Sequence, residues 1–244
     1  MIVSAETALA KFQASSHRPL VAALPFYRGD IEQAFRWLQW ANFLSRQPGG
    51  DVSRHLLLIF HRSGISPKLL AGIRNLQLSQ PPFFLTGWVS DMAEDSQQAI
   101  AHVLQWVEHN LPGHATLCCN PDTCPIRPPW FDEIADEYAG SPEPFMGDFI
   151  EGRWHENCND HMPNDGSVYA ANWRALAPSI LRDAVDTQIA EDVLKYFHHA
   201  NTLQQVWQAD PWTEDNLKRL RPGTALVHQC KDGTLQALLR KRFA

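Results

Sequence analysis

The sequence predicts an α/β fold in which helices cover both faces of a mostly parallel central β-sheet. Three observations carry this prediction. Continuous apolar runs recur along the first half of the chain, amphipathic helical patterns alternate with them, and turn residues separate the two. Apolar runs without alternation suit parallel strands that are covered on both faces. Their alternation with helices is typical of a doubly wound, Rossmann-like sheet.

The first four strands are expected where short apolar runs end at turn residues. They cover residues 20–26, 55–60, 82–85 and 115–119. Helical spacing of apolar residues predicts a helix capped by Asp30, a helix over 66–75 and a helix that begins at Asp95. An amphipathic stretch follows the fourth strand at 130–138.

The amino-acid composition changes after residue 140, where a Gly- and Pro-rich segment leads into a loop rich in His, Asn and Asp. Further strands are expected at 145–150, 166–170 and 224–227, and a helix at 189–199. We therefore expect one domain with two halves, a nucleotide-binding half at 1–140 and an acceptor-binding half at 141–244.

Composition bounds the class of protein. With 44% apolar and 20% charged residues, the 244-residue chain has the make-up of a packed globular protein. It contains no apolar run near the roughly 20 residues that span a bilayer, and its amino terminus lacks the pattern of a signal peptide. Five cysteines without repeated spacing suit a reducing compartment. We expect a soluble, cytoplasmic protein without a membrane span.

The net charge of −6 gives the chain no general attraction for polyanions. A nucleic-acid partner would need a local basic patch, for which 218–221 and 240–242 are the candidates. Either cluster is equally well explained as a solvated surface.

The turn Asn120-Pro121-Asp122-Thr123 ends the apolar run at 115–119 and places a carboxylate at the end of a strand. Open α/β sheets bind ligands at the carboxyl edge of their strands. The same residue types also form turns that bind nothing. A second strand end, after 224–227, delivers His228, with Lys231 three residues later. A histidine in such a place is also common as an ordinary core or surface residue.

These two stretches resemble the metal-binding elements of GT-A-type glycosyltransferases. In that group a strand ends in an Asp-x-Asp or Glu-x-Asp pair, often followed by a Pro and a Trp-containing helix. A His-x-x-Lys or His-x-x-Gly-x-x-Lys element lies near the carboxyl terminus. Here Asn120 occupies the first acidic position. An amide oxygen still binds a cation, but with one charge fewer we expect weaker binding.

The resemblance implies a Mn²⁺ or Mg²⁺ ion held by Asn120, Asp122 and His228. The ion would bridge the two phosphates of a nucleoside-diphosphate sugar, and Lys231 would neutralise the leaving diphosphate.

The segment 25–30 resembles the donor-base loop of the same group. There Pro25, Phe26 and Tyr27 would contact the nucleobase, with aromatic rings stacking on it, and Asp30 would hydrogen-bond to the base or ribose. A plain helix cap is the alternative role for Asp30.

Two further segments resemble the acceptor side of GT-A enzymes. Asp165 and Gly166 lie in a loop where a glycine lets the backbone approach the donor sugar. Glu191 and Asp192 resemble an acidic helix start near the reacting sugar, where a carboxylate serves as general base; we prefer Asp192. A solvated helix cap is the alternative for this pair.

The sequence therefore predicts a glycosyltransferase that moves a sugar from a nucleoside-diphosphate sugar to an acceptor hydroxyl. Two other classes stay open. A nucleotidyltransferase also places carboxylates at strand ends, although the Gly-rich basic loop usual after its first strand is missing. A non-catalytic sugar-nucleotide-binding relative would account for Asn120. The acceptor is left open between a polysaccharide and a hydroxymethylated DNA base, as in viral DNA-modifying enzymes of this group.

Overall fold

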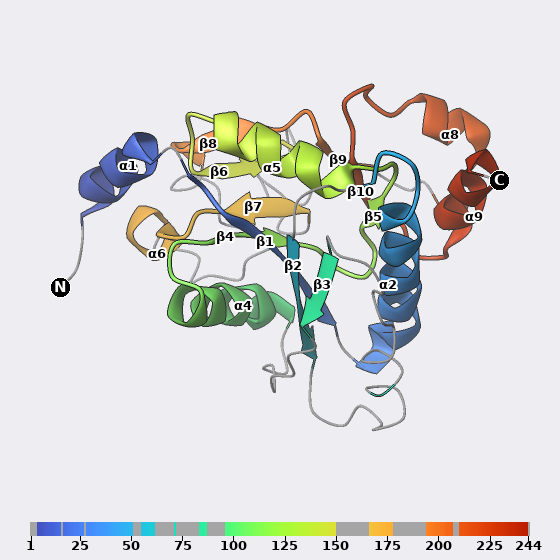
Figure 1. Ribbon diagram of the computed structural model, residues 1–244, viewed down its shortest axis with the longest axis horizontal. Helices are drawn as coiled ribbons and strands as arrows, with labels where there is room; N and C mark the ends of the chain where they lie inside the picture. The colour runs from blue at the N-terminus through green and yellow to red at the C-terminus, as the bar shows by residue number, and fades with distance from the viewer. Residues whose placement is uncertain are drawn as a thin grey trace, which may run out of the picture.

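Two β-sheets form the framework of the computed structural model (Figure 1). The structure describes residues 4–15, 17–26, 28–50, 55–61, 71, 83–86, 96–149, 166–177, 194–206 and 210–243. Within these ranges the larger sheet has seven strands in the order β3-β2-β1-β4-β7-β6-β8, and the smaller has three in the order β5-β10-β9.

The first half of the large sheet is parallel, as predicted. Its strands are β1 (Leu20–Phe26), β2 (His55–His61), β3 (Phe83–Thr86) and β4 (Ala115–Cys118). Ala23 of β1 pairs with Leu58 of β2 on one side and with Cys118 of β4 on the other. The chain moves outward from β1 to β3 and then returns to the other side of β1 at β4. The strand order thus reverses between β1 and β4, which is where open α/β sheets form their ligand crevice.

Helices cover both faces of this sheet, which confirms the predicted fold class. Successive side chains of a strand point to opposite faces. Leu20, Ala22, Leu24 and Phe26 pack in one cluster with the buried side of α2 (Ile31–Ser45), whereas Val21 and Ala23 pack in another with α4. The helix α4 (Ser96–Asn110) contributes the expected apolar face of Ile100, Val103, Leu104 and Val107. Figure 1 shows α4 on one side of the strands and α5 (Trp130–Gly140) on the other.

The second half of the large sheet is mixed. The strand β7 (Ser167–Tyr169) runs antiparallel to β4 and to β6 (Phe145–Gly147), so both strands expected here are confirmed but shorter. The helix expected over 189–199 is wrong at its carboxyl end, because β8 (Phe197–His199) pairs parallel with β6. Pairing along the sheet outweighs a helical spacing of apolar residues at this point. Residues 189–193 and the helix expected at 66–75, apart from residue 71, lie outside the described ranges.

The small sheet was not expected from the sequence. Its central strand β10 (Leu226–His228) runs antiparallel to β5 (Cys124–Pro125) and parallel to β9 (Leu203–Gln205). The strand predicted at 224–227 thus begins two residues later and ends at His228 itself. Because β5 follows β4 by only a short turn, this sheet brings the end of β4 close to the end of β10.

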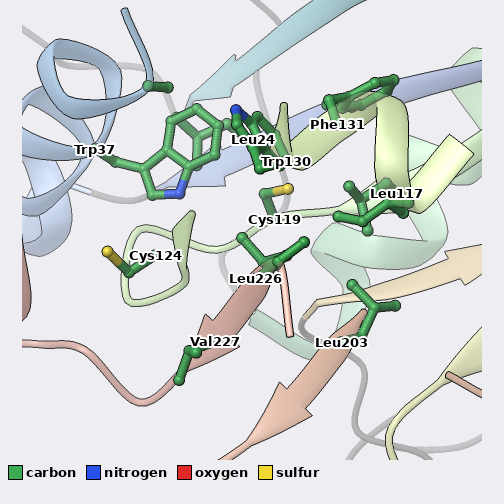
Figure 2. Close-up of a cluster of buried hydrophobic side chains, with 14 of the residues drawn as sticks. Leu24, Trp37, Leu117, Cys119, Cys124, Trp130, Phe131, Leu203, Leu226 and Val227 are labelled. Carbon is green, nitrogen blue, oxygen red and sulfur yellow. The ribbon is translucent and has the colours of Figure 1, made fainter. Parts of the chain in front are cut away.

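One apolar core joins the two sheets. Figure 2 shows Leu117 of β4 and Leu226 of β10 in the same buried cluster as Trp37 of α2 and Trp130 of α5. All four side chains are at most 1% exposed. The four described cysteines are buried, and none of them forms a disulfide: Cys118, Cys119, Cys124 and Cys230.

The amino-terminal helix α1 (Ala5–Ala14) is connected to the carboxyl end of α5 through Arg18. Its guanidinium donates to the carbonyl oxygens of Tyr138, Ala139 and Ser141, and lies 3.9 Å from the ring centroid of Phe12. A cation at a helix carboxyl terminus satisfies carbonyls that have no partner within the helix.

Three short or terminal helices complete the described structure: α6 (Trp173–Leu176), α8 (Glu214–Lys218) and α9 (Thr234–Arg242). None of the helices in the described part of the chain combines the length and apolar character that crossing a bilayer requires.

Candidate functional site

The acidic turn after β4 is closed by its own hydrogen bonds. The carbonyl oxygen of Asn120 accepts from the backbone nitrogen of Thr123 at 2.9 Å and from its hydroxyl at 2.7 Å. The buried indole of Trp37 donates to the same hydroxyl at 3.0 Å. A side chain of α2 therefore helps to hold the turn in place. The side chain of Asp122 is largely buried, with 17% of its area exposed.

His228 meets Asp122 at this edge. Nε2 of His228 lies 3.2 Å from Oδ1 of Asp122. The backbone nitrogen of Cys230 donates to the carbonyl oxygen of Asp122 at 2.7 Å, so the two strand ends are also joined through their backbones. Gln229, between His228 and Cys230, adopts a positive φ of 72°. This left-handed conformation turns the chain directly after His228.

The carboxylate of Asp122 is stabilised in its ionised form. Burial acts to raise its pKa, but the hydrogen bond and charge of His228 and the charge of Lys231 outweigh burial, and the pKa lies below the ordinary value. An ionised carboxylate is the form that binds a divalent cation.

Lys231 lies near the Asp122–His228 pair, and its backbone is held by two hydrogen bonds. Its backbone nitrogen donates to Asp210 at 2.8 Å, and its carbonyl oxygen accepts from Arg36 at 2.9 Å. The side chain itself is exposed and close enough to influence the ionisation of Asp122. This places an exposed positive charge near the carboxylate, and a positive charge favours an anionic ligand.

Segment 25–30, for which the sequence predicts contacts with the donor base, differs from that expectation in the exposure of its side chains. Pro25 and Phe26 are buried at the end of β1, and Phe26 belongs to the apolar core with 0% of its area exposed. Phe26 therefore does not fit the expected role of a ring that stacks on a nucleobase. Asp30 occupies the cap position of α2, but its side chain makes no capping hydrogen bond, because the chain enters the helix through a short 3-10 turn, η1 (Arg28–Asp30). Tyr27 lies outside the described residues.

Gly166 lies beside the acidic turn. Its backbone nitrogen donates to the carbonyl oxygen of Cys118 at 2.7 Å, and its φ is 74°. An added Cβ would lie 3.8 Å from Leu226 and 3.9 Å from Thr123, so space is available and the positive φ is what favours glycine. The neighbouring Asp165 and the expected base residues Glu191 and Asp192 lie outside the described ranges.

The Asp122–His228 pair fits a divalent cation. Two ligands bound at about 2.1 Å and at a right angle to each other are about 3 Å apart, close to the observed 3.2 Å. No group of three or more His, Cys, Asp and Glu side chains with metal-site geometry occurs among the described residues. The amide of Asn120, which is partly exposed at the start of the same turn, is the third protein ligand that the sequence suggests.

Gln205 is a contact of this site that the sequence did not indicate. Its side-chain oxygen is hydrogen-bonded to Nδ1 of His228, on the side of the ring opposite Asp122. A glutamine in a polar stretch carries no periodicity or motif signal, so only the pairing of β9 with β10 reveals it.

No protein-family model matches the chain, and no curated protein matches it by sequence. Solved structures do match. The galactosyltransferase LgtC, in complex with donor and acceptor sugar analogues, aligns with a TM-score of 0.56 at 9% identity, over 91% of this chain and 96% of LgtC. The glycosyltransferase GlyE of Streptococcus pneumoniae TIGR4 aligns with a TM-score of 0.54 at 9% identity, over 92% of this chain and 60% of GlyE.

The chain has the GT-A fold. The bifunctional glycosyltransferase WbbM, in its apo form, aligns with a TM-score of 0.55 at 11% identity, over 86% of this chain and 45% of WbbM. This chain thus spans less than half of WbbM but nearly the whole of LgtC. In this GT-A fold, the strand ends that carry Asp122 and His228 meet beside the point where the strand order reverses.

Proposed function

We propose that this protein transfers a sugar from a nucleoside-diphosphate sugar to an acceptor hydroxyl. The observation that carries the proposal is the ionised Asp122 facing His228 at the carboxyl edge of a GT-A sheet, with Lys231 beside them. The structures that share this fold are described as a galactosyltransferase bound to donor and acceptor sugar analogues and as glycosyltransferases. Both the fold and the site therefore support sugar transfer.

In this proposal Asp122, His228 and the amide of Asn120 hold Mn²⁺ or Mg²⁺. Such an ion supplies positive charge to the diphosphate that leaves when the bond to the sugar breaks. Lys231 adds a second positive charge, because its exposed ammonium extends from a backbone fixed by Asp210 and Arg36. The hydrogen-bonded turn keeps Asp122 in place without reorganisation during the reaction.

The acceptor side of the proposal rests on Asp192, with Glu191 as the other candidate. A carboxylate there would accept the proton of the attacking hydroxyl. Asp165 and Gly166 would lie along the donor sugar, in keeping with the position of Gly166 beside the acidic turn. For the acceptor itself we retain the two expected classes, a polysaccharide and a hydroxymethylated DNA base.

A second candidate function follows from Asn120. A site with one carboxylate fewer than the usual acidic pair holds a cation less tightly. A protein that binds a sugar nucleotide without transferring the sugar would therefore also fit this chain.

Calorimetry tests the proposal directly. We expect uridine, guanosine or thymidine diphosphate to bind in the presence of Mn²⁺ and to lose binding when a chelator is added. The variant Asp122→Asn should bind weakly or not at all, whereas Asp215→Asn, which alters a carboxylate with 79% exposure on α8, should bind like the parent. Equal binding in chelator would refute the metal role, and no binding of any nucleotide would refute the donor class.

Turnover separates the two candidates. Release of nucleoside diphosphate from a matching sugar nucleotide, and its acceleration by a polysaccharide or by hydroxymethylated DNA, is expected of the transferase. Binding without any release, across a panel of donors and both acceptor classes, would favour the non-catalytic reading.

A further inference from the structure

Gln205 and His228 are direct neighbours in the small sheet. They are register partners on the parallel strands β9 and β10. The side-chain oxygen of Gln205 is hydrogen-bonded to Nδ1 of His228, while Nε2 of the same ring faces Asp122 at 3.2 Å. The imidazole is thus held between two side chains, one at each ring nitrogen.

The chemistry of the amide decides which nitrogen carries the proton. A carbonyl oxygen only accepts hydrogen bonds, so Nδ1 must donate to Gln205. Without a cation, Nε2 also carries a proton and donates it to the ionised carboxylate of Asp122. When a cation replaces this proton, Nδ1 keeps its own proton and the lone pair of Nε2 faces the ion on the side of Asp122. The opposite amide orientation would donate to Nδ1 and leave the proton on Nε2 as the only ring proton, so a cation could not replace it without leaving an anionic ring.

The backbone of Gln205 is fixed from the large sheet. Its nitrogen donates to Oδ2 of Asp148 at 2.6 Å. The other oxygen of Asp148 accepts from the backbone nitrogen of Phe149 at 3.0 Å and lies 2.9 Å from Nε2 of His199 and 3.1 Å from Nη2 of Arg221. Asp148 follows β6 and has only 13% of its side chain exposed. A continuous set of contacts therefore runs from the large sheet through Gln205 to His228.

We propose that Gln205 is a positioning residue for the cation site: it orients the imidazole of His228 and keeps the proton on Nδ1, so that Nε2 and Asp122 bind the ion together. This inference rests on the proposed function. Outer partners of metal-binding histidines set the ring orientation and the tautomer, and their removal typically weakens metal binding about 10- to 100-fold.

The next residue on the strand offers a matched control. The side-chain oxygen of Gln204 accepts from the backbone nitrogen of Arg221 at 2.9 Å and from the hydroxyl of Thr224 at 2.7 Å. It belongs to the same strand as Gln205 and is also hydrogen-bonded, but to Arg221 and Thr224. Gln204→Met thus tests for general damage to β9, and Gln205→Met tests the contact with His228.

The experiment measures Mn²⁺ binding by electron paramagnetic resonance of the free ion, with and without nucleoside diphosphate. We expect Gln205→Met to weaken Mn²⁺ binding about 10- to 100-fold. Gln205→Glu, which keeps an acceptor at this position, should retain most of the affinity, and Gln204→Met should match the parent. Unchanged affinity in a folded Gln205→Met protein, or equal losses in both methionine variants, would overturn the proposal.

Nitrogen-15 spectra of the histidine rings give a readout that needs no metal. In the metal-free parent we expect Nδ1 of His228 to be protonated, and we expect this signature to be lost in Gln205→Met but kept in Gln204→Met. An unprotonated Nδ1 in the parent, or a signature that persists without Gln205, would refute the assignment. If the parent binds no Mn²⁺ at all, the proposed function fails, and these spectra alone still decide whether Gln205 sets the tautomer.

Discussion

Asn120 limits the charge available to a cation at this site. Its backbone is locked into the turn by Thr123, so the side chain begins from a fixed point next to Asp122. We predict that Asn120→Asp tightens Mn²⁺ binding. The added attraction at about 4 Å is on the order of 4 kcal/mol for each unit of charge on the ion, at an effective dielectric constant near 20. Desolvation and repulsion from Asp122 offset much of it.

A Mn²⁺ titration of the parent and of Asn120→Asp at fixed nucleotide concentration measures this change. Weaker or unchanged binding in a folded variant would mean that the side chain at position 120 points away from the ion. Asp122 and His228 would then hold the ion mainly with phosphate and water.

Substitution of Asp122 and of Asp192 should have different effects, because Asp122 is proposed to bind the ion and Asp192 to accept a proton. We predict that Asp122→Asn weakens donor binding and turnover together. Asp192→Asn should leave donor binding nearly unchanged and abolish turnover, since a general base contributes mainly in the transition state. Calorimetry paired with steady-state rates makes the comparison, and parent-like donor binding by Asp122→Asn would contradict its role.

At the scale of elements, Glu137 of α5 holds the turn between β8 and β9. Its carboxylate accepts from the backbone nitrogens of Asn201 at 2.7 Å and Thr202 at 2.9 Å, and lies 3.3 Å from Nε2 of His198. Burial acts to raise its pKa, but these hydrogen bonds outweigh burial and lower the pKa below the ordinary 4.5. The ionised carboxylate therefore stabilises the strand that carries Gln205.

We predict that Glu137→Gln lowers the free energy of unfolding at pH 7 by about 1–3 kcal/mol, because the amide turns a donor toward backbone donors. A carboxyl with a lowered folded pKa contributes stability above its unfolded pKa and loses it as the pH falls through the folded pKa. The difference in free energy of unfolding between the parent and Glu137→Gln should therefore become smaller at acidic pH. Urea unfolding of both proteins at pH 7 and near pH 4 measures it, and a constant difference would contradict the assignment.

Strands with continuous apolar runs could be predicted from the sequence. Short strands that are recognised only by their hydrogen-bonded pairing with a neighbouring strand could not. The runs of β1, β2 and β4 stand out, and Asp122 and His228 were found because each ends such a run. The strands β5 and β9 have two and three residues, too few to show a period. Phe26 shows a related limit, because an aromatic residue at a strand end suits a stacking platform and a buried core equally well.

For the whole molecule, the shared core means that the two sheets should unfold together. Leu226 of the small sheet is 1% exposed and packs in the cluster that also contains Leu117 of the large sheet. We predict that Leu226→Ala lowers the free energy of unfolding by about 2–5 kcal/mol. The parent and the variant should each show one transition, so the halves at 1–140 and 141–244 would not separate.

Thermal unfolding followed by both near- and far-ultraviolet circular dichroism checks this prediction. Leu220→Ala, at a partly buried position on the rim of the same cluster, is the control and should cost less. Two transitions, or non-coincident curves from the two probes, would show that the halves unfold independently.

The link from Arg18 to the carboxyl end of α5 has a consequence for local opening of the chain. If α1 detached together with Arg18, the carbonyl oxygens of Tyr138, Ala139 and Ser141 would lose the hydrogen bonds from its guanidinium at the same moment. Opening of α1 should therefore lower the free energy needed to unfold the last turn of α5. The amides of these two segments, far apart in sequence, should exchange with solvent as one cooperative unit.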